Sequence, residues 1–301
     1  MNNEERSKDR GATGTRTAAT AVLMVATFMD LMDSTITNVA LPTIGKDLGA
    51  TPEQLEWTLA GYIIAFATLL ITGGRLGDVF GHRRIFVIGM VGFTLASLGA
   101  ALSQSGELLV AARVLQGGFA GIMMPQVLSS VQVMYAPEER APVLGLIGAL
   151  SSLGAVGGLV LGGWLVTIDL FGMGWRSVFL VNVPVGVVIV AAALALVPRS
   201  RSEHPLKPDP AGALLGGLGV FLVVFPLTDG RAAGWAWWIW AMLTTAPFII
   251  AAFVWQQRRM LKAHGSPLLP LPLFRDRGFA SGQLVQVLSS IGNGGYVLIL
   301  L

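Results

Sequence analysis

The feature that most constrains this chain is a succession of long apolar segments separated by short polar breaks. A helix that spans a bilayer needs about 20 mainly apolar residues. Charged residues make up only 12% of the chain, which is about half the share that is usual in a soluble domain. The sequence therefore predicts an all-α polytopic membrane protein. Nine segments are predicted to span the membrane, at roughly residues 18–41, 55–74, 84–104, 107–133, 142–167, 176–197, 210–228, 235–255 and 279–301.

The distribution of basic residues predicts the orientation of these spans. With the N-terminus in the cytoplasm, sixteen of the 20 Lys and Arg residues fall on the cytoplasmic side, three fall on the opposite side, and Arg113 lies within a span. This asymmetry follows the positive-inside rule and accounts for the basic charge without a nucleic-acid partner. We expect a multi-pass protein of the plasma membrane. Its N-terminal tail, residues 1–17, is polar and is expected to be cytoplasmic and disordered.

Two aspartates interrupt the first span, in the stretch FMDLMDSTITNVALP (28–42). Asp30 and Asp33 are three residues apart, so a helix places them on nearly the same face. Each costs about 2.5–3.5 kcal/mol within a bilayer unless it is hydrated or paired. Two carboxylates in such a place are therefore candidate functional groups. For Asp30 the alternative is a polar side chain that faces water in a cavity.

Arg113, in the fourth span, is the candidate partner of the first-span acids. Asp33 lies ~12 Å and Arg113 ~9 Å from the outer ends of their spans, from a rise of 1.5 Å per residue. Since these depths agree to within the length of an arginine side chain, we predict an Asp33–Arg113 ion pair. The alternative is that the Arg113 side chain extends to the outer interface.

Glycine patterns predict two close contacts. The stretch GGRLGDVFGHRR (73–84) is expected to form a tight cytoplasmic loop, with Gly81 at the turn. In that loop Asp78 would lie at the start of the third helix, where the helix dipole favours a negative charge. In the fifth span, small residues at intervals of four predict a groove against which a neighbouring helix packs or slides. The groove residues are Gly154, Gly158 and Gly162, followed by Gly163.

The remaining polar residues indicate a transport path rather than an enzyme. The chain has no cysteine, and its three histidines are expected in polar loops, so no metal site is predicted. Neither a nucleophile–base arrangement nor a nucleotide-binding loop is present in the sequence. Four amides in or beside the spans are candidate substrate-path residues: Asn38, Gln116, Gln126 and Asn182.

Four stretches, in this order, resemble the major facilitator superfamily and, more closely, its 14-span drug:proton antiporter branch of the EmrB/QacA type. They are MDSTITNVALP (32–42), GRLGDVFGHRR (74–84), RVLQG (113–117) and WRSVFLVNVPVG (175–186). The resemblance implies a major facilitator fold with a six-helix bundle at 18–197, loops and two inserted helices at 198–278, and the first helix of a second bundle at 279–301. That bundle would be incomplete, so we expect a chain truncated at its C-terminus.

The resemblance also implies residue roles. The family's first-span Asp falls on Asp33 and its fourth-span Arg on Arg113. Its cytoplasmic loop motif falls on Gly74, Asp78, Gly81, Arg83 and Arg84. Three features depart from the family pattern: Val79 and His82 stand where basic residues are usual, Leu159 stands where proline is usual, and most of the second bundle is missing.

The resemblance implies proton-driven export of small amphipathic compounds, and hence drug resistance, by alternating access. Asp33 would exchange protons under the influence of Arg113, while Asp30 would bind a substrate cation or a second proton. The partners would be protons, a small-molecule substrate and the lipid bilayer, with the proton gradient in place of a cofactor. Two alternatives remain open: a non-transporting fragment or assembly module, and a symporter or uniporter for another small solute.

Overall fold

The protein is described by a computed structural model that covers residues 3–168, 172–200, 209–231, 233–264, 268, 273, 275–285 and 288, with side chains omitted at 3–13 and 263–264. Within these ranges every regular element is helical. The helices are α1 (Asn3–Leu48), α2 (Pro52–Phe80), α3 (His82–Ala101), α4 (Gly106–Met134), α5 (Pro137–Ile168), α6 (Ser177–Leu180), α7 (Asn182–Leu196), α8 (Pro210–Asp229) and α9 (Trp237–His264).

Eight segments of the described residues are long and apolar enough to cross a membrane, and they correspond to the first eight predicted spans. The sixth is composite, because a 3-10 turn at Gly174–Arg176, α6 and α7 follow one another over Gly174–Leu196. The predicted ninth span, 279–301, lies outside the described residues except for helical residues 279–285 and 288. The expectation of a disordered tail is wrong from residue 3 onward: α1 begins at Asn3, and Glu, Arg and Lys in this segment favour helix.

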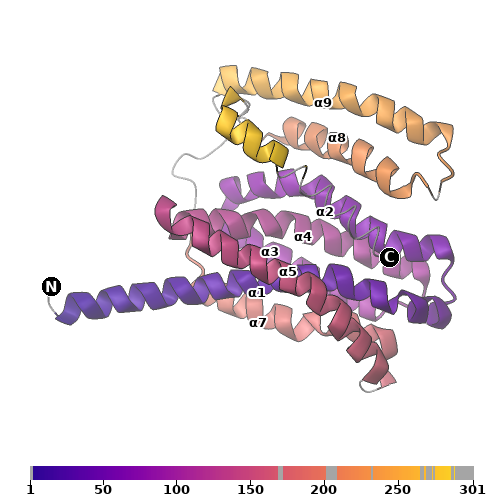
Figure 1. The fold of residues 1–301 in the computed structure, drawn as a ribbon, viewed down its shortest axis with the longest axis horizontal. Helices are drawn as coiled ribbons and strands as arrows, with labels where there is room; N and C mark the ends of the chain where they lie inside the picture. The colour runs from indigo at the N-terminus through magenta and orange to yellow at the C-terminus, as the bar shows by residue number, and fades with distance from the viewer. Residues whose placement is uncertain are drawn as a thin grey trace.

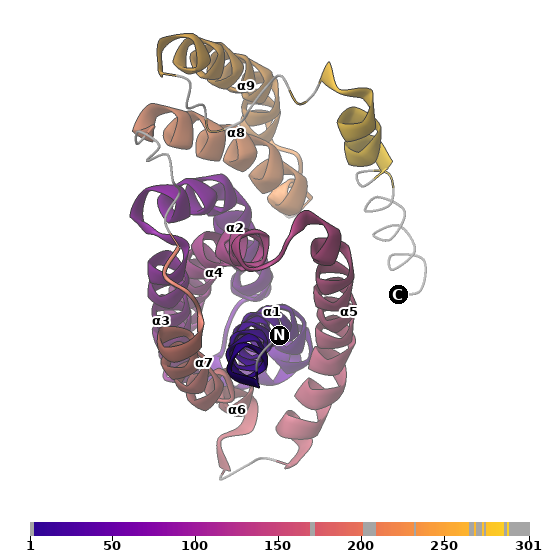
Figure 2. The ribbon, with the colours of Figure 1, turned by 90° about the vertical axis from the view of Figure 1, so that its left-hand side faces the viewer.

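The first seven helices form a bundle with α1 at its centre. Figure 2 looks along the helices and shows α1 surrounded by α2, α3, α4, α5 and α7. Helices α8 and α9 lie outside this bundle, with α8 against α2 and α9 against α8 (Figures 1 and 2). More than half of the membrane-spanning part of α1 is therefore buried by neighbouring helices, and the faces that carry Asp30 and Asp33 are turned into the bundle.

Glycines let α4 approach α2 at backbone distance. A Cβ at Gly117 would overlap the carbonyl group of Tyr62, and one at Gly121 would lie 2.5 Å from the carbonyl oxygen of Phe66. On the facing helix, a Cβ at Gly73 would lie 2.5 Å from the α4 backbone. Because real side chains do not approach so closely, this crossing requires glycine on both helices.

The predicted glycine groove of α5 faces α1. Cβ atoms at Gly154, Gly158 and Gly162 would lie 2.9, 2.6 and 3.2 Å from three carbonyl oxygens of α1 that are spaced four residues apart. Gly163, the fourth predicted member, does not belong to the groove, since its Cβ would have nothing within 4 Å. One step along a helix turns a residue by about 100°, so the neighbour of a groove residue points elsewhere. The α1 carbonyls belong to Phe28, Met32 and Ile36.

Both ends of α8 are fastened to neighbouring helices. At its start the buried Asp209 carboxylate accepts hydrogen bonds from the Gly212 amide (2.8 Å), from Gln256 Nε2 of α9 (2.7 Å) and from Gln257 Nε2 of α9 (2.9 Å). Near its other end the ring of Phe225 packs between Trp57 of α2 and Trp238 of α9, with centroid separations of 5.4 and 6.1 Å. Helices α8 and α9 are thus joined to each other and to the bundle.

The core of the bundle consists of two apolar clusters separated by a polar layer. Along α1, residues from Ala19 to Met29 contribute to one cluster, and residues from Ile36 to Ile44 contribute to the other. Asp30 and Asp33 lie in the gap between them. Because an apolar cluster packs on each side of this layer, the two acids are enclosed within the bundle.

Candidate functional site

The centre of the polar layer is the predicted ion pair between α1 and α4. Arg113 Nη1 lies 2.5 Å from Asp33 Oδ2. Asp33 is 0% exposed and Arg113 is 1% exposed, so the alternative of an Arg113 side chain at the outer interface is wrong. Breaking one side of such a buried pair leaves an uncompensated charge, whereas the intact pair is held by attraction in a medium of low dielectric constant.

The second oxygen of Asp33 is bound by α7. Asn182 Nδ2 donates to Asp33 Oδ1 (2.5 Å) and to Ser97 Oγ of α3 (3.0 Å). Ser97 Oγ in turn donates to the Phe179 carbonyl oxygen of α6 (2.9 Å). Asn182 and Ser97 are both 0% exposed. The Asp33 carboxylate therefore connects α1 directly to α4 and α7. Through Asn182 and Ser97 it is also linked to α3 and α6.

Arg113 uses further donors to hold its position. Nη1 donates to Gln116 Oε1 (2.7 Å), and Nε donates to the Thr58 carbonyl oxygen of α2 (3.2 Å). The guanidinium carbon also lies 4.3 Å from the ring centroid of Tyr62 and 5.7 Å from that of Phe179. Both separations are within the range of cation–π attraction. Arg113 is thus held by four surrounding groups in addition to Asp33.

Two of the four predicted substrate-path amides belong to this network. Gln116 and Asn182 are each 0% exposed. Within the described part of the chain, Gln116 Nε2 and Asn182 Oδ1 are buried without a hydrogen-bond partner. Buried polar atoms are normally satisfied, so these two retain hydrogen-bonding capacity beside the ion pair.

The other two predicted amides lie elsewhere. Asn38 is exposed, and its Nδ2 donates to the carbonyls of Ser34 and Thr35 in its own helix at 3.3 Å each. Gln126 is 0% exposed, but it lies ten residues from Gln116, about three turns toward the C-terminal end of α4. The structure therefore brings together two of the four amides, and the role of all four in a substrate path stays a prediction.

Asp30 has a partner that the sequence analysis did not identify. Tyr62 Oη of α2 donates to Asp30 Oδ1 at 2.6 Å. Asp30 and Tyr62 are each only 4% exposed, so the alternative in which Asp30 faces cavity water does not hold in this structure. The two aspartates share a helix face but differ in partner, since one meets a cation and the other a neutral hydroxyl group.

The predicted loop at 73–84 is mostly helical. Helix α2 continues through Phe80, so Gly74 and Asp78 lie within it, and the turn is confined to Gly81 with φ 97° and ψ 132°. An isolated glycine only weakens a helix, whereas a positive φ ends one. Asp78 does not cap α3 from a loop as predicted; its Oδ1 lies 3.8 Å from His82 Nε2, at the first residue of α3.

Gln126 and His82 form a cluster at the turn between α2 and α3. Gln126 Nε2 donates to the Gly73 carbonyl oxygen (2.7 Å), and Gln126 Oε1 lies 3.0 Å from His82 Nδ1. A Cβ at Gly77 would overlap the Gln126 side chain. His82 is 5% exposed, so the prediction that it lies in a polar loop is wrong. It is buried because Gly77 of α2 leaves room for the side chains of both His82 and Gln126.

The two loop arginines have different environments. Arg83 Nη1 donates to the carbonyls of Leu194 (3.1 Å) and Val197 (3.2 Å), at the end of α7. The last carbonyls of a helix lack partners within it, so Arg83 fastens α3 to α7. Arg84 is exposed. Gly74 makes no backbone contact, since a Cβ there would meet only a Pro125 side-chain atom at 3.8 Å.

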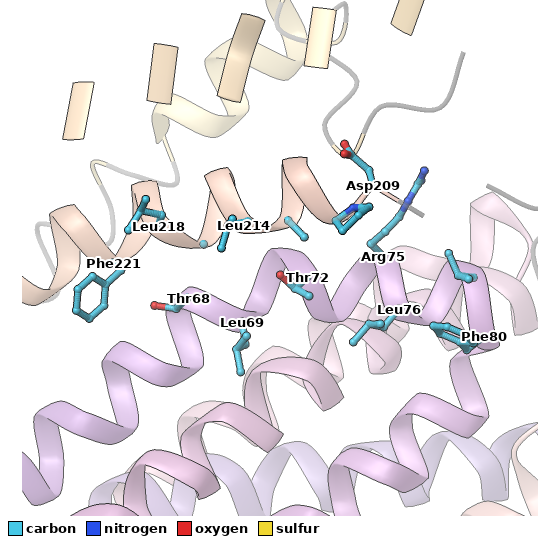
Figure 3. Close-up of a pocket in the computed structure, with 14 residues that line it drawn as sticks. Thr68, Leu69, Thr72, Arg75, Leu76, Phe80, Asp209, Leu214, Leu218 and Phe221 are labelled. Carbon is cyan, nitrogen blue, oxygen red and sulfur yellow. The ribbon is translucent and has the colours of Figure 1, made fainter. Parts of the chain in front are cut away.

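A cavity of about 620 Å³ lies apart from the acid network, between α2 and α8. Figure 3 shows side chains from both helices along it, with Arg75 and Asp209 at one end and Phe221 toward the other. Most of its lining is apolar, and none of the polar-layer residues contributes to it. The cavity is therefore a gap between the bundle and α8 rather than part of the ion-pair site.

Sequence comparison identifies relatives over nearly the whole chain. A family model described as Major Facilitator Superfamily matches residues 23–299. The "Probable actinorhodin transporter" of Streptomyces coelicolor is 41% identical over 285 residues, which cover 95% of this chain and 49% of that protein. The "Tetracenomycin C resistance and export protein" of Streptomyces glaucescens is 35% identical over 277 residues, which cover 90% and 48%. The chain spans about half the length of these curated relatives.

Structure comparison agrees on the fold. The proton:xylose symporter XylE, bound to 6-bromo-6-deoxy-D-glucose, matches with a TM-score of 0.55 and 13% sequence identity, over 83% of this chain and 56% of that one. The human organic anion transporter MFSD10 matches with a TM-score of 0.53 and 15% identity, over 72% and 56%. At these identities the likeness concerns the arrangement of helices alone.

Proposed function

Because the chain belongs to the major facilitator superfamily, we propose that it acts in a proton-coupled secondary transporter that exports small amphipathic organic compounds by alternating access. The observation that carries this proposal is the fully buried Asp33–Arg113 pair, which lies between two membrane-spanning helices. An ionisable pair within a membrane bundle is expensive to maintain and is characteristic of proton and ion pathways.

The coupling step follows from the charges of this pair. A proton that binds Asp33 removes the negative charge that attracts Arg113, while Asn182 continues to bind the side chain. The contact between α1 and α4 is then weakened, and the arginine is left with Gln116, the Thr58 carbonyl and the aromatic rings. Protonation thus biases two packings of the bundle, which is the requirement for a switch. The proton gradient supplies the free energy, with no cofactor or metal.

Moving parts are assigned to the two glycine-dependent contacts. The α5 groove of Gly154, Gly158 and Gly162 presents no side chains to α1, so α5 can rock against it. The cytoplasmic segment with Gly74, Asp78, Gly81, Arg83 and Arg84 acts as the gate, with Arg83 fastened to α7.

Export as the direction of transport and antibiotic-like compounds as the substrate class are supported by the relatives, whose names describe export and resistance. Placement in the 14-span drug:proton antiporter branch is supported by α8 and α9, two further spans after the six-span bundle. We also propose a location in the plasma membrane, with the N-terminus in the cytoplasm, from the bias of basic residues.

Proton movement in everted membrane vesicles tests the function. Vesicles acidified inside by respiration are loaded with a pH-sensitive dye, and candidate antibiotics are added. A substrate of the wild-type protein should cause protons to leave the vesicle and restore the fluorescence of the dye. Asp33→Asn should abolish this response, because the amide cannot exchange a proton at neutral pH.

Asp47→Asn is the matched control. Asp47 lies on the same helix and pairs with Arg176 at 2.5 Å, but both side chains are substantially exposed, so its replacement should leave proton release unchanged. A panel of compounds that all fail to release protons, or Asp33→Asn vesicles that respond like the wild type, would refute the proposal.

A further inference from the structure

Tyr62 touches both acid sites of the polar layer at once. Its hydroxyl group donates to Asp30 at 2.6 Å, while its ring face lies 4.3 Å from the guanidinium carbon of Arg113. Arg113 in turn binds Asp33 on its other side. The aromatic ring therefore lies between the carboxylate of Asp30 and the cation that pairs with Asp33.

The position of this ring is fixed by the close approach of α2 and α4. The carbonyl group of Tyr62 lies directly against Gly117, and the Cβ of Gly61, the preceding residue, would lie 2.8 Å from a Val114 methyl group. The ring also stacks on Phe66, with a centroid separation of 6.4 Å and an interplanar angle of 12°. The backbone contacts fix α2 beside α4, and the stacking on Phe66 and the hydrogen bond to Asp30 hold the ring in this orientation.

The charges around Asp30 do not balance when both carboxylates are ionised. Helix α1 contributes Asp30 and Asp33, α2 contributes the neutral Tyr62, and α4 contributes Arg113 as the single cation of this group. In their membrane-spanning parts α5 and α7 carry no charged side chain. A hydroxyl donor satisfies a hydrogen bond but does not neutralise a charge, and an uncompensated buried charge costs several kcal/mol or more.

We propose that Asp30 and Tyr62 form a second proton-binding site, in which Tyr62 is the positioning residue that keeps Asp30 out of the Asp33–Arg113 pair. A proton bound to Asp30 brings the group of two acids and one arginine to zero net charge. Asp30 is 4% exposed and its Oδ1 accepts the Tyr62 hydroxyl group, so a proton is the ligand that fits this site. This inference deepens the proposed proton coupling and rests on it, since it assigns the transporter two proton sites rather than one.

Infrared spectroscopy of the purified protein in lipid nanodiscs tests the inference without a substrate. At neutral pH the wild type should show the carbonyl stretching band of a buried, protonated carboxyl group. Asp30→Asn should remove this band, and an acid–base titration of that variant should release one proton fewer per molecule. In Asp33→Asn, Asp30 is the one acid of the group left to balance Arg113, so it should ionise and the band should disappear there too; the proton is therefore assigned to Asp30 by the Tyr62→Phe variant.

Tyr62→Phe separates positioning from packing, because it keeps the ring against Arg113 and deletes only the hydroxyl group. The band should shift to higher frequency, since a carbonyl that loses a hydrogen bond vibrates faster. Tyr135→Phe is the control: its hydroxyl group lies 2.7 Å from Thr20 Oγ1 and Arg16 lies 4.5 Å from its ring, but it is remote from the acids. It should leave the band unchanged.

Three results would overturn the second site: no such band in the wild type, a band that persists in Asp30→Asn, or an unshifted band in Tyr62→Phe. The outcome is independent of the vesicle assay. If Asp33→Asn still pumps while the band behaves as expected, the proton site stands and the proposed role of Asp33 fails.

Discussion

The coupling between Asp33 and Arg113 can be measured as a free energy with a double-mutant cycle. The variants are Arg113→Met, Asp33→Asn and their combination. Arg113→Met would leave the Asp33 carboxylate, which is 0% exposed in this structure, with the Asn182 donor alone, so this single change should cost about 3–5 kcal/mol. In Asp33→Asn the guanidinium keeps Gln116, the Thr58 carbonyl and the Tyr62 ring, which makes this cost the smaller of the two.

The double variant contains neither charge. It loses the hydrogen bonds of Arg113, at about 1 kcal/mol each, but it no longer buries an unpaired ion. The sum of the destabilisations of the two single variants should therefore exceed the destabilisation of the double variant by about 2–3 kcal/mol. This coupling energy is near the upper end of the values measured for residues in contact. Unfolding of the purified protein in mixed micelles, followed by circular dichroism over a titration with a denaturing detergent, provides all four free energies.

The exposed pair Asp47–Arg176 supplies the reference cycle. Its atoms are also 2.5 Å apart, but water screens it, so Asp47→Asn and Arg176→Met should couple by no more than about 1 kcal/mol. If the coupling energy of the buried pair were zero, or no larger than that of the exposed pair, the argument from burial would be wrong.

Two glycine substitutions test the contacts that form the site. Gly81→Ala should cost about 1–3 kcal/mol, because an alanine is strained at φ 97°; Gly74→Ala, whose nearest neighbour would be a side-chain atom at 3.8 Å, should be neutral in the same unfolding assay. Gly117→Ala forces a methyl group onto the α2 backbone and should cost about 1–3 kcal/mol or prevent folding, with loss of monodisperse protein in size-exclusion chromatography. Gly145→Ala, with nothing within 4 Å, is its control, and equal damage at both sites would contradict the packing argument.

The spans and the central ion pair could be predicted from the sequence because both depend on position along a helix axis. Length and hydropathy define a span, and the depth of a residue follows from counting along it. Depth alone therefore paired Asp33 with Arg113. It could not identify Tyr62 or Ser97 as partners, since their selection depends on how each helix is rotated about its axis and on which neighbour it meets.

The turn between α2 and α3 was harder to predict because several glycines in one stretch look equivalent. Gly77 makes room for Gln126, and Gly81 supplies the positive φ that ends α2, whereas Gly74 does neither. Only the packing of α4 against α2 distinguishes these roles. His82 was placed in a loop for the same reason: its polarity indicates exposure, but the space beside Gly77 buries it.

The attachment of α8 at both ends has a mechanical consequence. The Asp209 cluster joins α8 to α9 at one end, and the Trp57–Phe225–Trp238 stack joins both helices to α2 at the other, so α8 and α9 form one unit that is anchored to α2. When the bundle tilts, every part turns through the same angle, and the parts farthest from the pivot travel farthest. Helix α9 is the outer layer beyond α8, so a rotation of the bundle about the ion pair would displace α9 farther than the helices of the bundle (Figure 2).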